Sequence, residues 1–175
     1  MTREDGLELL IDGQSIEKRV IEIAAQISLD YTRKELLLVC ILKGAAIFFT
    51  DLARLLTIPA ILEFVQVSSY GNGTVSSRTV NMTKDICSDI SGKHVLLVDG
   101  IIDTGVTMDF LLNRYRERGP ASLRAAVLLD KRTRRTVAVP IDYRGFEIPD
   151  RFVVGYGMDS GEKYRNLPYI AVLPP

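Results

Sequence analysis

The sequence is poor in the residues that build metal clusters and disulfide frameworks. It has two cysteines and one histidine in 175 residues. Cys40 and Cys87 would be the only possible pair, and they lack CxxC spacing, which disfavours both a disulfide scaffold and a zinc site. Cys40 lies in the apolar run LLLVCI, where we expect an inert core residue. His94 lies at the start of a predicted strand and receives no role.

An excess of charge of either sign is also missing. The 22 basic and 22 acidic side chains cancel. The chain therefore has no global positive field of the kind that non-specific nucleic-acid binders use, and we expect no nucleic-acid partner. Any anion that the protein binds must be held by local groups.

Long hydrophobic runs are absent as well. No stretch reaches the roughly 18 consecutive apolar residues that a membrane span requires. The first residues, MTREDGLELLIDG, are mixed and acidic rather than basic and then apolar. We therefore expect a soluble, cytoplasmic protein with no membrane partner. A chain of 175 residues that is 47% hydrophobic is typical of one compact domain, residues 1–175.

Apolar periodicity predicts alternating helices and strands. With Asp12 or Ser15 as a possible N-cap, a helical pattern begins the chain, and continuous apolar runs typical of strands buried on both faces follow. The predicted elements are a helix over 16–27, a strand over 36–41, a helix over 45–56, strands over 61–67 and 95–98, a helix over 107–118 and a strand over 123–129. This order predicts an α/β fold whose parallel sheet is covered by helices on both faces.

Polar segments follow three of the predicted strands, after Ile41, Val67 and Val98. Ligands of parallel sheets bind beyond the carboxyl ends of the strands, where all three segments fall. Residues 68–85 are rich in Ser, Thr, Gly and Asn and are predicted to form a long loop. Loops of this length in compact domains are usually functional or disordered.

The segment LLVDGIIDTGVTM, residues 96–108, combines a buried strand with glycine, acid and hydroxyl groups. A turn that offers Gly105, Thr104, Thr107 and unpaired backbone N–H groups before a helix suits a phosphate. The alternative is a tight turn whose Asp or Thr merely caps the helix. The segment approaches the P-loop pattern, but Val106 replaces the phosphate-binding lysine, and GxGxxG occurs nowhere. Nucleoside-triphosphate and dinucleotide folds are therefore disfavoured.

The DTGxT turn after an apolar strand resembles the phosphoribosyl-pyrophosphate signature of the type I phosphoribosyltransferases. Further segments resemble, in order, those of the bacterial hypoxanthine-guanine phosphoribosyltransferases: LKG at 42–44, SSYG at 68–71, LLDKR at 128–132, GFEIPDRFVVGYGMD at 145–159 and EKYRNLPYI at 162–170. The resemblance covers nearly the whole chain. It implies the type I phosphoribosyltransferase fold, an α/β fold with a mostly parallel central sheet flanked by helices. It also implies a lid loop at about 68–84 and a small hood of terminal segments, its base-binding part at about 145–175.

The resemblance implies an enzyme of purine salvage. Such an enzyme transfers the 5-phosphoribosyl group from phosphoribosyl pyrophosphate to hypoxanthine or guanine and forms IMP or GMP and pyrophosphate. Asp103 is implied as the general acid/base near purine N7, with helix capping as the alternative. The residues implied in binding the sugar phosphate are Asp99, Asp103, Thr104, Gly105, Val106 and Thr107.

The remaining site residues follow from the same resemblance. Mg²⁺ is the implied cofactor, with Asp159 and Asp99 as its carboxylates. The other implied roles are pyrophosphate binding for Lys43, Gly44 and Arg165, purine binding for Lys131, Phe152, Val153 and Asp159, and the lid for Ser69 and Tyr70, with Lys131 and Arg165 also implied in catalysis. Lys131 would donate to the 6-oxo group and repel the 6-amino group of adenine. Core packing within FVV is the alternative for Phe152. In the family the peptide that precedes the lysine matched by Lys43 can be cis, so the resemblance implies Leu42-Lys43 as the place of a strained peptide.

The match departs from the family at Asp99-Gly100, where relatives usually carry Glu-Asp. Loss of a hydrogen bond to a charged group costs about 1.5–3 kcal/mol. We therefore expect a working but impaired enzyme that Gly100→Asp should improve.

Two other functions remain open. One is a homologue that binds purine nucleotides without turnover, and the other is an RNA-binding regulator that would need a basic face. We interpret the basic run Arg132–Arg135 as a solvated turn. The family commonly forms homodimers or homotetramers.

Overall fold

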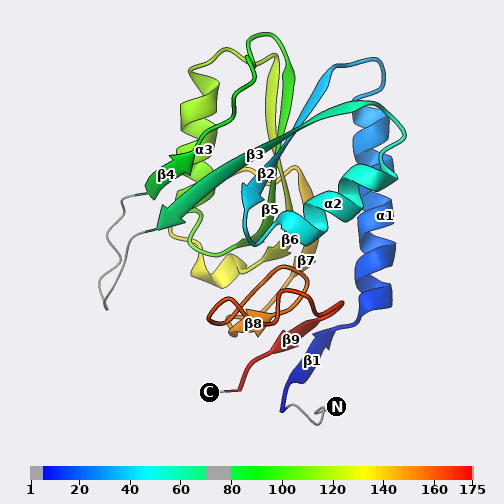
Figure 1. Cartoon of the computed structure of the whole chain (residues 1–175), viewed down its shortest axis with the longest axis vertical. Coiled ribbons are helices and arrows are strands. Elements are labelled where there is room, and N and C mark those ends of the chain that lie inside the picture. The colour runs from blue at the N-terminus through cyan, green and yellow to red at the C-terminus, as the bar shows by residue number, and fades with distance from the viewer. Residues whose placement is uncertain (1–5, 70–79, 175) are drawn as a thin grey trace.

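A computed structural model describes residues 6–69 and 80–174, with the side chains of 68 and 69 left out. Its centre is a six-stranded sheet in the order β4-β3-β2-β5-β6-β7 (Figure 1). The strands are β2 (Leu36–Leu42), β3 (Ala60–Ser69), β4 (Val80–Lys84), β5 (His94–Ile102), β6 (Ser122–Asp130) and β7 (Tyr143–Glu147). Only the edge strand β4 runs antiparallel to its neighbour within this sheet. The prediction of a mostly parallel sheet is confirmed.

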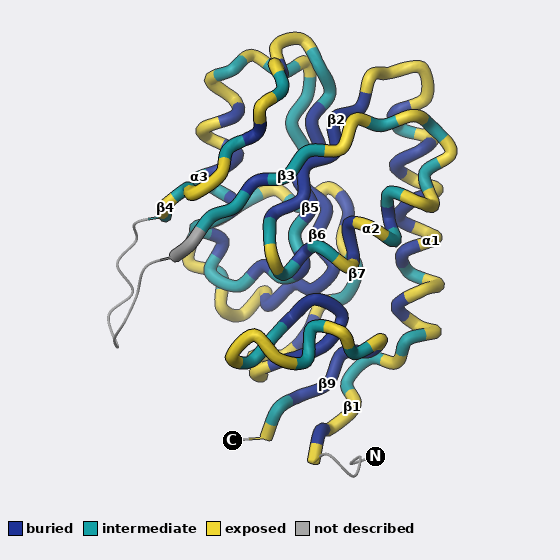
Figure 2. The backbone as a smooth tube through the Cα atoms, viewed as in Figure 1, coloured by how far each residue is buried: buried dark blue, intermediate teal, exposed yellow. Residues whose placement is uncertain are grey.

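The continuous apolar run of β2 is explained by helices on both faces of the sheet. The helices are α1 (Gly13–Asp30), α2 (Ala46–Leu55) and α3 (Val106–Arg116). Leu36, Leu38 and Cys40 pack on the side of α1 and α2. Leu37 and Val39 pack with α3 on the opposite side. Successive strand residues point to opposite faces, so a strand covered on both sides must be apolar throughout, as the buried centre in Figure 2 shows.

Helix α1 begins where a side chain satisfies its first backbone donors. The carboxylate of Asp12 accepts a hydrogen bond from the backbone N–H of Ser15 at 2.8 Å. Of the two candidate N-caps, Asp12 is therefore correct and Ser15 lies within the first turn. The apolar face then recurs every three to four residues, and Ile16, Val20 and Ile27 are all buried.

The two ends of the chain form a second, three-stranded sheet that we call the hood. Its order is β1-β9-β8, with β1 (Glu8–Ile11) antiparallel to β9 (Ile170–Val172) and β9 antiparallel to β8 (Val153–Val154). Glu8 and Arg151 join its edges through two hydrogen bonds of 2.7 and 2.6 Å. The hood lies at one end of the central sheet, where the first strand, β1, and the last strand, β9, run side by side (Figure 1).

Two predicted boundaries were wrong. Part of the polar segment 68–85 is strand, because β3 continues to Ser69 and pairs with β4. Strand β5 continues past Val98 to Ile102, because the ladder to β6 pairs Asp99 with Val127 and Ile101 with Leu129. Residues at the end of a strand can keep their backbone hydrogen bonds and still carry polar side chains. No helix of the described part of the chain is long and apolar enough to cross a membrane.

Candidate active site

The carboxyl ends of β2, β5 and β6 lie at one edge of the central sheet, and they bring together two of the three predicted polar segments, those after Ile41 and Val98, with the LLDKR segment at 128–132. These strands are neighbours in the sheet and run parallel, so their C-terminal residues lie side by side (Figure 1). Lys43 follows β2, Asp103 follows β5 and Lys131 follows β6. The backbone N–H of Lys131 donates to the carbonyl of Ile102 at 3.0 Å, which places Lys131 beside Asp103.

The turn from β5 into α3 has the geometry of a phosphate cradle. Gly105 is the N-cap of α3 with φ 90°, and no side chain of residues 6–69 and 80–174 caps the helix. Val106 and Thr107 lie in its first turn, whose backbone N–H groups have no intrahelical partner. A Cβ on Gly105 would lie 2.6 Å from the carbonyl oxygen of Val137, so space as well as φ requires glycine here.

Hydrogen bonds from the segment after β6 fix the backbone of the turn between β5 and α3. The carbonyl of Thr104 accepts hydrogen bonds from the backbone N–H groups of Thr136 and Val137, at 2.9 and 3.0 Å. The Nε of Arg135 donates to the carbonyl of Asp103 at 3.2 Å. Arg135 also forms an ion pair with Asp130, whose exposed fraction is 1%, so this guanidinium is tied to a buried carboxylate.

The interpretation of Arg132–Arg135 as a solvated turn is therefore wrong for its second half. The side chain of Arg134 contacts Asp103, with its Nε 3.1 Å from Oδ1. Arg134 and Arg135 both bind groups of the β5–α3 turn, which lies about thirty positions away in the sequence, and no local pattern indicates this pairing. Sequence reasoning missed both residues.

Asp99 lies in β5 and is half-buried as a residue. Desolvation of its carboxyl by the surrounding protein raises the pKa of that group to about 7. The next residue, Gly100, is buried. A Cβ there would lie 2.7 Å from the carbonyl oxygen of Gly44 and 3.0 Å from the sulfur of Met158. The same oxygen would also collide with a Cβ on Gly157. The Gly44 peptide thus lies between two glycines, one from β5 and one from the hood.

This contact corrects the expectation for Gly100→Asp. The resemblance implies a missing ligand carboxylate at this position, but the position has no room for any Cβ while Gly44 keeps its place. A collision with a backbone oxygen is not relieved by turning a flexible side chain. We now expect Gly100→Asp to displace the Lys43-Gly44 turn instead of improving the site.

Two of the predicted pyrophosphate residues, Lys43 and Arg165, are joined by ion pairs to Glu162, a residue that sequence reasoning missed. Glu162 is 3.2 Å from Nζ of Lys43 and 3.4 Å from Nη2 of Arg165. Asp159 receives Nη2 of Arg165 at 2.7 Å and the backbone N–H of Glu162 at 2.9 Å. The hydrogen bond from Lys43 lowers the pKa of the Glu162 carboxyl. The peptide between Leu42 and Lys43 is cis, as expected.

Arg165 also has one donor without a partner. Its Nη1 donates to the carbonyl of Gly157 at 2.7 Å, which fixes the guanidinium against the hood. Its Nε is buried and makes no hydrogen bond with the described residues. The two lysines of the site differ in exposure, since Lys131 is only 8% exposed while the Lys43 side chain is 56% exposed.

Two of the predicted base-binding residues, Phe152 and Val153, lie at the start of β8 in the hood. Phe152 is 56% exposed, so core packing, the alternative for this ring, is excluded. Val153 is buried in β8 and pairs with Val172. Ser69 ends β3, and no description of its side chain is given by the structure; Tyr70 lies outside the described residues.

The donor set fits a magnesium ion only in company with a ligand. Within residues 6–69 and 80–174, no three His, Cys, Asp or Glu side chains are grouped so that they could hold a metal. Mg²⁺ commonly keeps several waters and binds through one or two carboxylates plus substrate phosphates. Asp159 is a carboxylate of the kind that this mode of binding uses, and in the structure it forms an ion pair with Arg165.

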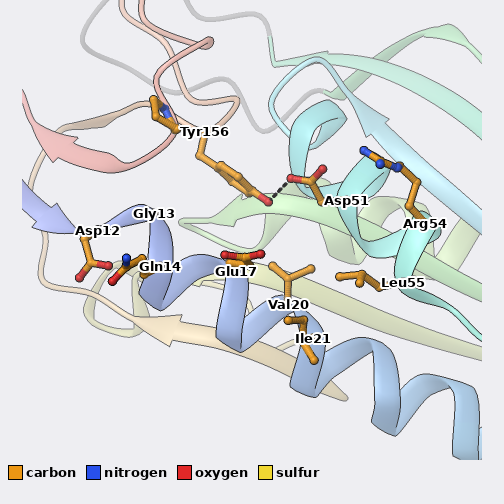
Figure 3. A pocket seen from close by; sticks show the side chains of 11 residues that line it. Asp12, Gly13, Gln14, Glu17, Val20, Ile21, Asp51, Arg54, Leu55 and Tyr156 are labelled. Carbon is orange, nitrogen blue, oxygen red and sulfur yellow. Dashed lines mark hydrogen bonds between the residues drawn. The ribbon is translucent and has the colours of Figure 1, made fainter.

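A separate cavity of about 720 Å³ lies between α1, α2 and the hood (Figure 3). It contains none of the predicted site residues; its lining is Asp12, Gly13, Gln14, Glu17, Val20, Ile21, Asp51, Arg54, Leu55, Tyr156 and Pro168. Tyr156 donates to Asp51 at 2.6 Å, which ties the hood to α2 behind the Lys43-Gly44 turn. Burial and this acceptor raise the pKa of Tyr156.

Comparison with known proteins agrees with this arrangement. The family model for the phosphoribosyl transferase domain matches residues 7–161. The chain is 44% identical to the hypoxanthine phosphoribosyltransferase of Haemophilus influenzae, over 94% of this chain and 93% of that protein. It is 41% identical to the hypoxanthine-guanine phosphoribosyltransferase of Bacillus subtilis, over 100% of this chain and 97% of that protein.

Among solved structures, the crystal structure of a hypoxanthine phosphoribosyltransferase from Staphylococcus aureus superimposes with a TM-score of 0.92. The two chains are 42% identical, and the match covers 96% of this chain and 91% of the other. With the parallel sheet, the hood and the glycine turn before α3, these matches show that the chain belongs to the phosphoribosyltransferase family and has its type I fold.

Proposed function

We propose that this enzyme transfers the 5-phosphoribosyl group from phosphoribosyl pyrophosphate to hypoxanthine or guanine, and so serves purine salvage. The observation that carries the proposal is the meeting of two groups at one sheet edge. The Gly105 turn, suited to a phosphate, lies beside Lys131, a buried cation suited to a purine oxygen. Asp103 lies next to both.

The 5-phosphate is assigned to the turn at the start of α3. The backbone N–H groups and hydroxyls of Thr104, Gly105, Val106 and Thr107 surround an anion there, and the helix dipole adds to the attraction. Asp99, in β5, and Asp103, in the turn before α3, are assigned to the sugar end of the same substrate. Lys43, Gly44 and Arg165 are assigned to the pyrophosphate, where the two side chains supply positive charge and the Nε of Arg165 is the donor that makes no hydrogen bond with the described residues.

In the proposed reaction, N9 of the purine donates its lone pair to C1′ of the ribose. The C1′–O bond to pyrophosphate breaks, and the leaving oxygen keeps the bonding pair. The proton on N7 of the purine passes to the carboxylate of Asp103, so the products are IMP or GMP, pyrophosphate and one proton. Lys43 and Arg165 offset the charge that develops on the leaving group.

Magnesium is the proposed cofactor. Mg²⁺ bound to the pyrophosphate oxygens would neutralise the leaving group, with Asp159 and Asp99 as carboxylates that hold it. Asp159 is oriented for this by Arg165 and the Glu162 backbone. Binding of a divalent ion at these carboxylates should be detectable by calorimetry only when pyrophosphate is present.

The base is assigned to the cleft between Lys131 and the hood. Lys131 donates to the 6-oxo group and disfavours adenine, whose 6-amino group presents a donor. Phe152 offers an exposed ring for stacking, and the backbone of Val153 and the carboxylate of Asp159 complete the purine contacts. We also propose that Ser69 and Tyr70 act as a lid that excludes water, and that the single-domain chain forms a homodimer or homotetramer.

The test is direct. The purified protein is mixed with phosphoribosyl pyrophosphate, Mg²⁺ and hypoxanthine, guanine or adenine in turn, and nucleotide formation is followed by absorbance. We expect product with the two 6-oxopurines and little with adenine. Failure with both 6-oxopurines would refute the proposal.

The rival function, nucleotide binding without turnover, has no support from the comparisons. Its motive was the glycine at position 100, which the structure accounts for as a packing position under Gly44. The relatives compared above are named as transferases.

A further inference from the structure

The turn after β6 carries Arg134, whose side chain lies between Asp103 and Asp150. Nε of Arg134 donates to Oδ1 of Asp103 at 3.1 Å, and its Nη1 lies 3.7 Å from Oδ2 of Asp150. The other oxygen of Asp150, Oδ1, lies 3.8 Å from Nζ of Lys131. Four charged side chains of alternating sign therefore connect the candidate general base to the candidate base-binding lysine.

The contact with Arg134 makes the two carboxylate oxygens of Asp103 different. Oδ1 is held by Arg134, while Oδ2 accepts no hydrogen bond from the described residues. A carboxylate with one oxygen fixed presents the other in a defined direction. Enzymes commonly orient a catalytic base in this way, with a third group that never touches the substrate.

We propose that Arg134 is a positioning residue for Asp103, and that Asp150 in turn positions Arg134. The inference rests on the proposed function and extends it to two residues to which we assigned no role. With Oδ1 engaged, Oδ2 is the oxygen that takes the proton from the purine. The Asp150 contacts keep Arg134 and Lys131 on the same side of the cleft as the incoming base.

The turn that carries Arg134 is well anchored, so the contact is more than a chance surface pair. The backbone N–H of Arg134 donates to the carbonyl of Lys131 at 3.0 Å. The next residue, Arg135, is joined to the carbonyl of Asp103 and to buried Asp130, which Arg144 also contacts at 2.9 Å. Exposed ion pairs add little to stability, and the Arg134 side chain is 50% exposed. Its effect should therefore appear in rate instead of in folding.

Four variants test the inference. Arg134→Ala removes the contact, Arg134→Lys keeps the charge, and Asp150→Asn removes only the outer support. Arg132→Ala is the matched control, because Arg132 lies exposed on the same turn and its side chain forms no ion pair with the described residues. Steady-state kinetics with hypoxanthine and phosphoribosyl pyrophosphate are measured for each, with and without millimolar guanidinium.

We expect kcat to fall about 10- to 100-fold in Arg134→Ala, with KM for phosphoribosyl pyrophosphate unchanged within about threefold. Guanidinium should restore part of the lost kcat in that variant and none in the control. Arg134→Lys and Asp150→Asn should lie between Arg134→Ala and the wild type. A merely structural role would predict no rescue by guanidinium.

Equal kcat in Arg134→Ala and Arg132→Ala overturns the inference and leaves the proposed function intact. A defect confined to KM, or a lost kcat that guanidinium does not restore, also overturns it. A wild-type protein that forms no nucleotide refutes the proposed function itself, and this inference falls with it.

Discussion

A methyl group added at Gly100 should damage the site by displacing the backbone of the Lys43-Gly44 turn. The Cβ of Gly100→Ala would lie 2.7 Å from the carbonyl oxygen of Gly44 and 3.0 Å from the sulfur of Met158. The sulfur can move, but the oxygen belongs to the backbone of the turn that carries Lys43. Relief therefore requires that the turn shift by several tenths of an ångström.

Extra atoms in a well-packed interior typically cost about 1–3 kcal/mol. We expect Gly100→Ala to lower the free energy of unfolding by that amount, measured by urea denaturation. Since the displaced turn is assigned to pyrophosphate, KM for phosphoribosyl pyrophosphate should rise about tenfold while KM for hypoxanthine changes little. Gly100→Asp should be at least as damaging, because it adds the same Cβ and a carboxylate.

Gly44→Ala is the control for stability. It adds a methyl group on the other side of the same contact, where no atom lies within 4 Å of its Cβ. Its free energy of unfolding should stay within about 0.5 kcal/mol of the wild type. If Gly100→Asp matched the wild type in stability and bound phosphoribosyl pyrophosphate more tightly, the steric argument would be refuted and the lost carboxylate would explain the departure after all.

Three further predictions concern pH, a buried charge and the base. Burial raises the pKa of the Asp99 carboxyl to about 7, so the folded protein holds this proton more tightly than the unfolded chain does. The free energy of unfolding therefore falls as pH rises through 7. Urea denaturation without metal should show that Asp99→Asn has a higher free energy of unfolding than the wild type, and this difference should be about 1–3 kcal/mol larger at pH 8 than at pH 5. An equal difference at the two pH values would contradict the raised pKa. Arg135→Ala leaves buried Asp130 with Arg144 alone and should lower the free energy of unfolding by about 3 kcal/mol; a loss under about 1 kcal/mol would mean that the ion pair is dispensable. Phe152→Ala should raise KM for hypoxanthine about tenfold with nearly unchanged stability, because the ring is 56% exposed; a strong loss of stability with unchanged KM would instead assign it to packing.

The fold followed largely from local patterns. The apolar run of β2 predicted a strand covered on both faces, and Leu37 and Leu38 indeed pack on opposite sides of the sheet. The glycine and hydroxyl groups at 104–107 predicted a cradle before a helix, and Gly105 is the N-cap of α3. Such features depend on side-chain period and backbone conformation, which neighbouring residues determine. The strand β1 was not predicted as such, because its pairing partner β9 lies at the other end of the chain.

The functions of single positions were decided by contacts that no local pattern encodes. From the sequence alone, Gly100 is interpreted as a lost carboxylate, Arg134 and Arg135 as part of a solvated turn, and Glu162 receives no role. Tertiary structure placed Gly100 under the Gly44 carbonyl, Arg134 on Asp103, and Glu162 between Lys43 and Arg165. Side-chain period fixes which way a residue points within its own element, but the partner that it meets there depends on how distant elements pack. The residue types were sufficient to predict the chemistry, while the packing determined which of them touch.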